Sequence, residues 1–256
     1  MAESVKRSGR KMYCDRLPEN METIVWRYMD DWKFIDLIEQ RSLYLHRGDR
    51  LQDRFEGTYS RQQMSDTYRW WEELEEKGSL TKGYSLDLKE QYQENRRKFY
   101  LNCWCMYPHD LDLMWKAYTK VCKAVAIQSR VSRLAAVCDC EKSPNHLPIL
   151  NISTIKYCGL KEGDFIDEFP TGFNPFIHKD YHFGLDKEIR IIHRYPNLQD
   201  SNLNPEGRYM PVDLSLLIDR VVLSPGSTPK DAEVIKDLLD EAGLKNIPVK
   251  SSRYET

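Results

Sequence analysis

Short apolar runs and helix-like repeats alternate along most of this chain. After a polar lead-in over residues 1–20, the run ETIVWRYM predicts a strand, and the next residues place Phe34, Ile35 and Ile38 at helical spacing. A second strand, SLYLHR, follows at once. The ordered part of the chain is therefore expected to open with a strand, a short helix and a strand.

The middle of the chain repeats this arrangement after two helices. Residues 60–78 place Tyr68, Trp71 and Leu74 on one helix face with Gly78 as a stop, and we expect this helix to pack over the preceding loop LHRGDRLQDRFEGTYS. A polar helix is predicted over residues 86–97. Then KFYLNCWCM predicts a buried strand, PHDLDLMWKAYTK a helix opened by Pro108, and VCKAVAIQS another buried strand.

The last third predicts four strands and a well-marked helix. The strands are ISTIKYC, EIRIIHR, GRYMPVD and RVVLSP, with one helical turn, SLLID, between the last two. In TPKDAEVIKDLLDEAG, Thr228 caps the helix, Pro229 lies in its first turn, Gly243 ends it, and four apolar residues face inward: Val234, Ile235, Leu238 and Leu239. The closing IPVKSSRY is expected to be an edge strand.

No internal repeat or Gly/Ser linker divides the chain. The strands are joined mostly by loops or short helices, an arrangement that favours antiparallel pairing with helices laid over the sheet. We therefore predict one α+β domain over residues 21–256, with a mixed, largely antiparallel sheet and flanking helices.

Composition adds that the chain is globular and nearly neutral. The apolar content is 41%, the formal net charge is -2 and the pI is about 6.3. The molecule as a whole therefore lacks the positive net charge that attracts nucleic acid. No run approaches the roughly 20 apolar residues of a membrane span, and the first residues lack the apolar core of a signal peptide. We expect a cytoplasmic protein with no membrane contact.

The cysteines suit a reducing compartment. They number seven and lack the dense, even arrangement of a disulfide scaffold. Two CxC pairs, Cys103/Cys105 and Cys138/Cys140, raise the alternative of zinc, but structural zinc usually uses CxxC-like spacing. Reduced thiols and no metal site are the expectation.

Two early segments carry candidate binding groups, although phosphate loops, HExxH and GxSxG motifs are absent. Arg27 interrupts an apolar strand, where an inward guanidinium needs an anion; the alternative is an arginine that faces solvent. Next, LYLHRGDRLQDRFEG follows a strand end, where loops often bind ligands. An Arg47–Asp49 ion pair that fixes the turn is the other interpretation, and both can hold together.

Two later segments add aromatic and acidic candidates. CWCM and MWKAY are expected to bring Trp104, Trp115 and Tyr118 near one another, as core or as a surface for a planar ring. In FGLDKEIRII, Glu188 and Arg190 share one face of a strand. A strand-borne carboxylate in a cleft can hold sugar hydroxyls and stabilise a developing cation. The alternative is a same-face ion pair on an edge strand, which contributes little stability.

Together, WRYM, LYLHRGDRLQDRFEG, CWCM with MWKAY, KAVAI and FGLDKEIRII resemble a widespread bacterial family known only as a domain of unknown function, over about residues 24–252. A more distant resemblance concerns the opening strand, helix and strand and the late strand that starts at glutamate. This layout is similar to the ADP-ribosyltransferase superfamily, closest to the branches that modify DNA bases or remove a 2'-phosphate from RNA. That resemblance implies a split sheet and NAD as substrate.

The resemblance also implies roles for single residues. Arg27 would hold the adenosine side of NAD and Glu188 would be the late-strand catalytic glutamate. Further candidates for binding NAD lie along the same segments: Tyr28, Arg47, Asp49, Trp115, Tyr118 and Arg190. The implied activity is NAD-dependent ADP-ribosyl transfer by a bacterial toxin or anti-phage effector, with RNA, DNA or protein as acceptor and an antitoxin or defence-system partner. The alternative is a non-catalytic nucleotide or nucleic-acid binding module of a defence system.

Overall fold

The computed structural model describes residues 12–51, 53, 56–120, 123–139, 149–160, 174–195 and 206–254. Its opening elements are β2 (Ile24–Asp30), α1 (Asp31–Gln40) and β3 (Ser42–Arg47), which confirms the predicted strand, helix and strand. Phe34, Leu37 and Ile38 bury the inner face of α1, whereas Ile35, predicted to join them, is exposed. Within the predicted lead-in, Met12–Arg16 form β1.

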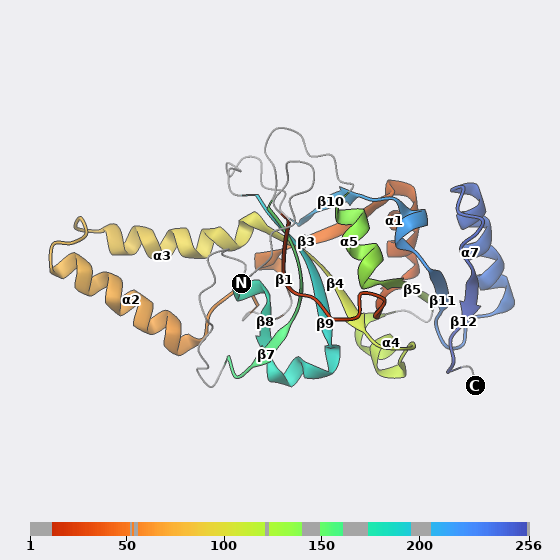
Figure 1. The fold of residues 1–256 in the computed structure, drawn as a ribbon, viewed down its shortest axis with the longest axis horizontal. Coiled ribbons are helices and arrows are strands. Elements are labelled where there is room, and N and C mark those ends of the chain that lie inside the picture. The colour runs from red at the N-terminus through yellow and green to blue at the C-terminus, as the bar shows by residue number, and fades with distance from the viewer. Residues whose placement is uncertain are drawn as a thin grey trace.

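The main sheet is mixed and mostly antiparallel, as predicted (Figure 1). Its order is β1-β6-β9-β4-β2-β5-β11-β12, and β10 joins through β3, which pairs with β4. Among its described strands, the β1/β6 and β11/β12 pairs are parallel and the others antiparallel. The strands not yet given are β4 (Phe99–Met106), β5 (Ala124–Arg130), β6 (Ile149–Thr154), β9 (Glu188–Arg194), β10 (Gly207–Pro211), β11 (Arg220–Leu223) and β12 (Val249–Ser251).

The sheet splits at β4. One side of β4 pairs with β9 from Phe99 to Cys105. The other side pairs with β3 only at Leu101 and Tyr100, and with β2 only at Met106 and Cys105. Because β2 and β3 diverge here, the centre of β4 has no complete backbone ladder on that side. Side chains replace some of the missing backbone hydrogen bonds. Asn102 donates to the Tyr44 carbonyl at 2.9 Å, and Arg27 donates to the Cys103 carbonyl at 3.0 Å.

Helices cover both faces of the sheet. The larger core packs α1, α5 (Val131–Asp139), α6 (Leu214–Leu217) and α7 (Pro229–Glu241) against one face, and a smaller core holds α4 (Asp112–Tyr118) against the other (Figure 1). Trp104 belongs to the larger core and Trp115 to the smaller one. The expectation that these two rings lie near each other is therefore wrong. Residues alternate between faces along β4, so Cys105 faces the smaller core and its neighbour Trp104 faces the larger one.

Several boundaries differ from the predictions. The helix α4 begins at Asp112, four residues after Pro108, and α5 was not predicted. ISTIKYC divides into β6 and β7 (Lys156–Cys158), and β7 pairs with β8 (His178–Asp180) in a separate two-stranded sheet. In α7 the cap at Thr228 is confirmed, but Val234 is exposed while Ile235 and Leu239 are buried. β12 forms the predicted edge strand.

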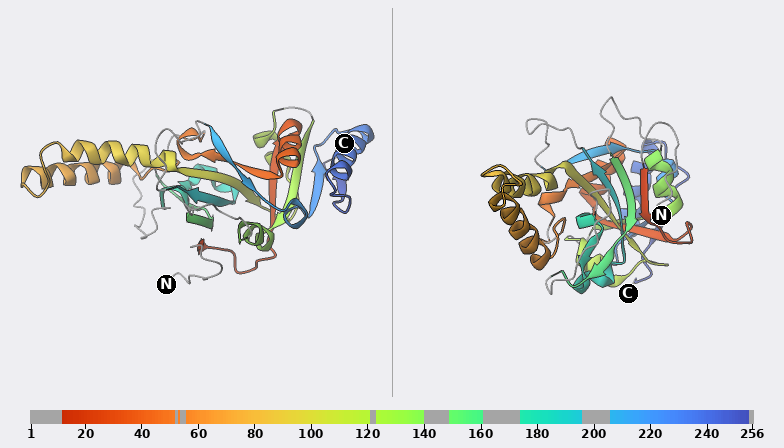
Figure 2. Two further views of the ribbon diagram at one scale, coloured as in Figure 1. Left: turned by 90° about the horizontal axis from the view of Figure 1, so that it is seen from above. Right: turned by 60° about the vertical axis from the view of Figure 1, so that its left-hand side comes forward.

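Two helices form a projecting hairpin. α2 (Arg61–Glu76) and α3 (Tyr84–Asn95) pack against each other and extend away from the body, as Figures 1 and 2 show. The expected packing of the first helix over the loop before it is therefore not what the structure has. None of the helices in the described ranges is long and apolar enough to span a membrane.

Candidate functional site

A buried cluster of charges lies at the start of β9. Arg190 binds Glu188 through two bonds, Nε to Oε1 at 2.9 Å and Nη2 to Oε2 at 3.0 Å. Both side chains are almost fully buried. They face the same way because they are two residues apart on a strand, and they lie opposite Cys105 and Cys103 of β4. The predicted same-face pair is confirmed, but β9 is an interior strand between β6 and β4, not an edge strand.

Glu56, which is distant in sequence, and Lys179 and Asp186, which precede β9, complete the cluster. Glu56 Oε1 accepts from Arg190 Nη2 at 2.9 Å and lies 3.2 Å from Lys179 Nζ. Lys179 also contacts Glu188 at 3.1 Å and Asp186 at 2.8 Å. Three carboxylates thus face two cations. Burial alone would raise the pKa of Glu188, but Arg190 and Lys179 outweigh it and lower this pKa to about 2, so the carboxylate is ionised at neutral pH.

Local backbone geometry positions these partners. Glu56 precedes Gly57, whose φ is +72°. Glycine is needed there because other residues rarely adopt a positive φ and because a Cβ would clash with the Phe176 ring. Lys179 lies on β8, and Asp186 ends the 3-10 helix η4 (Tyr181–Asp186). Sequence reasoning missed Glu56, Lys179 and Asp186. The one available signal was the Glu56–Gly57 pair inside the charged loop after β3.

Arg27 occupies the split in the sheet. Its Nη1 donates to the Cys103 carbonyl at 3.0 Å, and the side chain is partly buried. Within the described residues no carboxylate forms an ion pair with it. Burial lowers the pKa of Arg27, since a desolvated guanidinium without a counter-ion is disfavoured. The anion that an inward arginine needs is therefore not supplied by the described part of the chain.

Arg27 and Glu188 act on a common neighbour. The pKa of Cys105 is raised chiefly by burial and further by Glu188, whereas Arg27 lowers it. Both charged groups therefore lie within electrostatic range of one thiol. They make no direct contact in the described structure. Arg27 lies across from Ile127 of the larger core and Glu188 across from Cys105 of the smaller core, so a ligand that touches both would have to reach both faces of the sheet through the split.

Aromatic side chains border the buried cluster. Tyr118 is 37% exposed, and its pKa is raised by burial and by the nearby carboxylates of Asp186 and Glu188. Phe183 of η4 is also 37% exposed, and Lys179 Nζ lies 4.6 Å from its ring centroid. We call Tyr118 and Phe183 the aromatic rim. A planar ring could stack on such a surface.

Two predicted site residues lie in the smaller core. Tyr28 and Trp115 make an edge-to-face contact with ring centroids 4.9 Å apart, and both are buried. The Tyr28 hydroxyl accepts a hydrogen bond from the Leu111 N–H. Burial raises the pKa of Tyr28. These rings support the strand under the site and do not offer a free face to a ligand.

Arg47 and Asp49 form the predicted ion pair. Arg47 Nε lies 2.6 Å from Asp49 Oδ1 and Nη2 lies 3.0 Å from Oδ2, which holds the 3-10 turn η1 (Gly48–Arg50). Arg96 then links this turn to the cluster, because its Nη2 donates to the carbonyl of Gly48 at 3.4 Å and to the carbonyl of Glu56 at 2.6 Å. The pair thus fixes the turn, and Arg96 and Glu56 connect that turn to the site.

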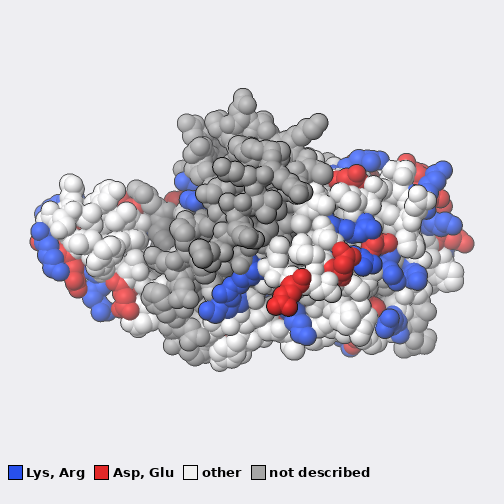
Figure 3. Space-filling model, viewed as in Figure 1, with Lys and Arg blue, Asp and Glu red and all other residues white. Residues whose placement is uncertain are grey.

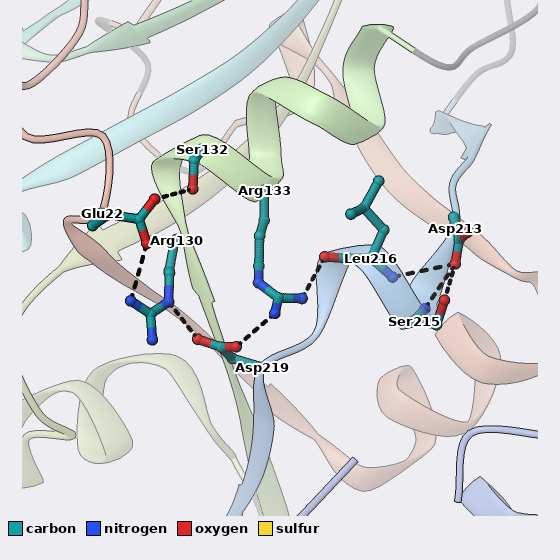
Figure 4. A pocket seen from close by; sticks show the side chains of 8 residues that line it. All are labelled: Glu22, Arg130, Ser132, Arg133, Asp213, Ser215, Leu216 and Asp219. Carbon is teal, nitrogen blue, oxygen red and sulfur yellow. Dashed lines mark hydrogen bonds and ion pairs between the residues drawn. The ribbon is translucent and has the colours of Figure 1, made fainter. Parts of the chain in front are cut away.

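A separate pocket of about 690 Å³ lies between α5 and α6 (Figure 4). Arg130 Nε binds Asp219 at 2.8 Å, Arg133 Nη2 binds the other Asp219 oxygen at 3.0 Å, and Arg130 Nη1 binds Glu22 at 3.1 Å. The charges in it are therefore already satisfied by one another. Its lining residues are Glu22, Arg130, Ser132, Arg133, Asp213, Ser215, Leu216 and Asp219, and none of them is a predicted site residue.

The candidate site offers anion binding, an ionised carboxylate and an aromatic surface. Across the described ranges, no three His, Cys, Asp or Glu side chains converge as metal ligands. Of the predicted residues, Glu188, Arg190 and Tyr118 gather around Cys103 and Cys105. Arg27 comes from the opposite face of the sheet, because it alternates with Trp26 and Tyr28 of the smaller core, and it reaches the Cys103 carbonyl in the split. Comparison of the chain with models of protein families, with curated proteins and with solved structures found no match.

Proposed function

We propose that the protein is an NAD-dependent ADP-ribosyltransferase whose site lies between the split in the sheet and the start of β9. The observation that carries this proposal is Arg27, a partly buried cation that binds a carbonyl and has no carboxylate partner among the described residues. A guanidinium in that state suits the pyrophosphate of a dinucleotide, because its planar fork binds two phosphate oxygens together.

Glu188 suits the chemical step. When the bond between nicotinamide and ribose C1' breaks, neutral nicotinamide leaves and positive charge develops on the ribose. A fixed carboxylate stabilises that charge, and the low pKa of Glu188 keeps it ionised at neutral pH. The acceptor then bonds to C1' and loses a proton. Arg190 and Lys179 hold the carboxylate in place before the reaction, so little reorganisation is needed.

The aromatic rim suits the leaving group. Nicotinamide is planar, and a stacked aromatic wall excludes water from its glycosidic bond. Tyr118 and Phe183 present partly exposed rings beside the cluster that contains Glu188. The proposed setting is the bacterial cytoplasm, with RNA, DNA or protein as acceptor, in a toxin or an anti-phage effector that an antitoxin or defence partner controls.

The test is to incubate the purified chain with NAD labelled in the adenylate part, in separate reactions that each also contain RNA, DNA or lysate. We expect label on one acceptor class together with release of nicotinamide. Glu188→Gln should abolish both, while Glu39→Gln, an exposed change on α1, should leave both unchanged. If Glu188→Gln folds poorly, Tyr118→Ala probes the rim instead. Neither label transfer nor nicotinamide release, beside a working control transferase, would refute the proposal.

One observation favours a second candidate, a non-catalytic nucleotide-binding module. Both oxygens of Glu188 are already engaged by Arg190 and Lys179, which is also what a purely structural carboxylate would show. Calorimetric titration with NAD separates the two functions. A binder would retain its affinity in Glu188→Gln, would lose it in Arg27→Met, and would release no nicotinamide in either form.

A further inference from the structure

Among its described side chains, the hairpin formed by α2 and α3 buries no large apolar residue. We call residues 61–98 the hairpin arm. Gln63 is the buried residue of α2, while Tyr68, Trp71 and Leu74 on its inner face stay only partly covered. Trp70 is 56% exposed and Leu86 is 59% exposed. A two-helix arm that leaves so much apolar surface in water is weakly stabilised unless another surface covers it.

Polar contacts hold the two helices of the arm together. Glu72 binds Lys89 across the hairpin, and Lys89 Nζ lies 5.3 Å from the Tyr68 ring centroid. At the outer end, Glu75 accepts from the N–H groups of Gly83 at 2.7 Å and Ser85 at 2.9 Å. The arm therefore keeps a defined shape as it projects from the body (Figure 2), and it can act as a preformed docking surface.

Charge is distributed unevenly along the arm. The outer half, residues 72–87, has five carboxylates and two lysines, a net charge of -3. The inner half, residues 61–71 and 88–98, has six basic and three acidic side chains, a net charge of +3. Both kinds of charge are visible at the hairpin end of the molecule in Figure 3.

We propose that the hairpin arm pairs with the arm of a second copy of this chain, antiparallel and about a two-fold axis. In that arrangement each acidic outer half lies against the basic inner half of the partner, whereas parallel pairing would oppose like charges. Trp70 lies near the middle of the arm, so the two copies of this ring meet close to the axis and are covered. The acidic outer half disfavours a nucleic acid or an anionic membrane as the occupant.

The first test measures the mass of the full chain by sedimentation velocity over a range of concentrations. We expect a dimer for the natural chain. Trp70→Glu should weaken the dimer at least about tenfold, since it puts a charge at the centre of an apolar contact. Trp32→Glu is the matched control: Trp32 is 60% exposed but lies on α1, and its replacement should leave the dimer intact. Circular dichroism verifies that each variant is folded.

The second test exchanges charges between the halves. Arg61→Glu with Arg69→Glu makes the inner half acidic, and Glu73→Lys with Glu76→Lys makes the outer half basic. Each double variant alone should be monomeric, and an equimolar mixture should recover the dimer, because both contacts are then attractive. A monomeric natural chain, a dimer indifferent to Trp70→Glu, or a mixture that stays monomeric would each overturn the proposal.

Discussion

Arg190 forms a two-point ion pair with Glu188, two residues before it on an interior strand, with Nε 2.9 Å from Oε1 and Nη2 3.0 Å from Oε2. An ion pair between two solvent-exposed residues on the same face of a strand adds little stability. Here both are buried, and Lys179 and Glu56 close the network around them. The same contacts that would orient the carboxylate for the proposed transfer also make it a structural element.

Glu188→Gln should lower the free energy of unfolding by about 3 kcal/mol, because removal of one partner leaves the other charges of a buried network uncompensated. Urea denaturation measures the change. Glu39→Gln on the surface of α1 should stay within about 0.5 kcal/mol of the natural chain. A loss below about 1 kcal/mol for Glu188→Gln would mean that the cluster is not the buried network described above.

Acid should weaken the protein through this same carboxylate. The pKa of Glu188 is about 2 in the folded state against an ordinary value of 4.5. A depressed folded-state pKa means that the stabilisation is complete above about pH 4.5 and is lost as the pH falls toward 2. The stability of the natural chain, measured by urea midpoints, should therefore decline over that window more steeply than that of Glu188→Gln. Parallel curves for the two would contradict the assignment.

Arg27→Met should separate stability from binding. The substitution removes the hydrogen bond to the Cys103 carbonyl, but it also removes a desolvated charge with no carboxylate partner among the described residues. These effects oppose each other, so the unfolding free energy should change by less than about 1 kcal/mol, while NAD binding should be lost. A destabilisation above about 2 kcal/mol with intact ligand binding would instead make Arg27 a purely structural residue.

Thr228→Ala should destabilise the C-terminal helix by about 1 kcal/mol. Thr228 and Asp231 form a capping box, with Asp231 N–H donating to Thr228 Oγ1 at 3.3 Å and Thr228 N–H donating to Asp231 Oδ2 at 2.8 Å. Thr81→Ala, an exposed change in the loop before α3, is the control. Thermal unfolding of both variants tests this, and equal melting temperatures would show that the cap contributes nothing.

Local patterns were sufficient for features whose parts are close in sequence. The strand, helix and strand at the start, the cap at Thr228 and the Arg47–Asp49 turn were all predicted, since spacing within one element fixes them. The pairing of Glu188 with Arg190 follows from the same two-residue period of a strand. The helix α5 was missed although Val131, Leu134 and Val137 recur at helical spacing.

The tertiary structure alone decided which distant groups share the site. Glu56 reaches Arg190 across 134 residues, and no local period reports on such a contact. Strand order likewise placed β9 inside the sheet, and the packing of α4 put Trp115 in a different core from Trp104. The sequence determined the elements and the short-range pairs, because these depend on neighbouring residues. The split beside β4 and the charge cluster depend on which strands meet, which only long-range packing fixes.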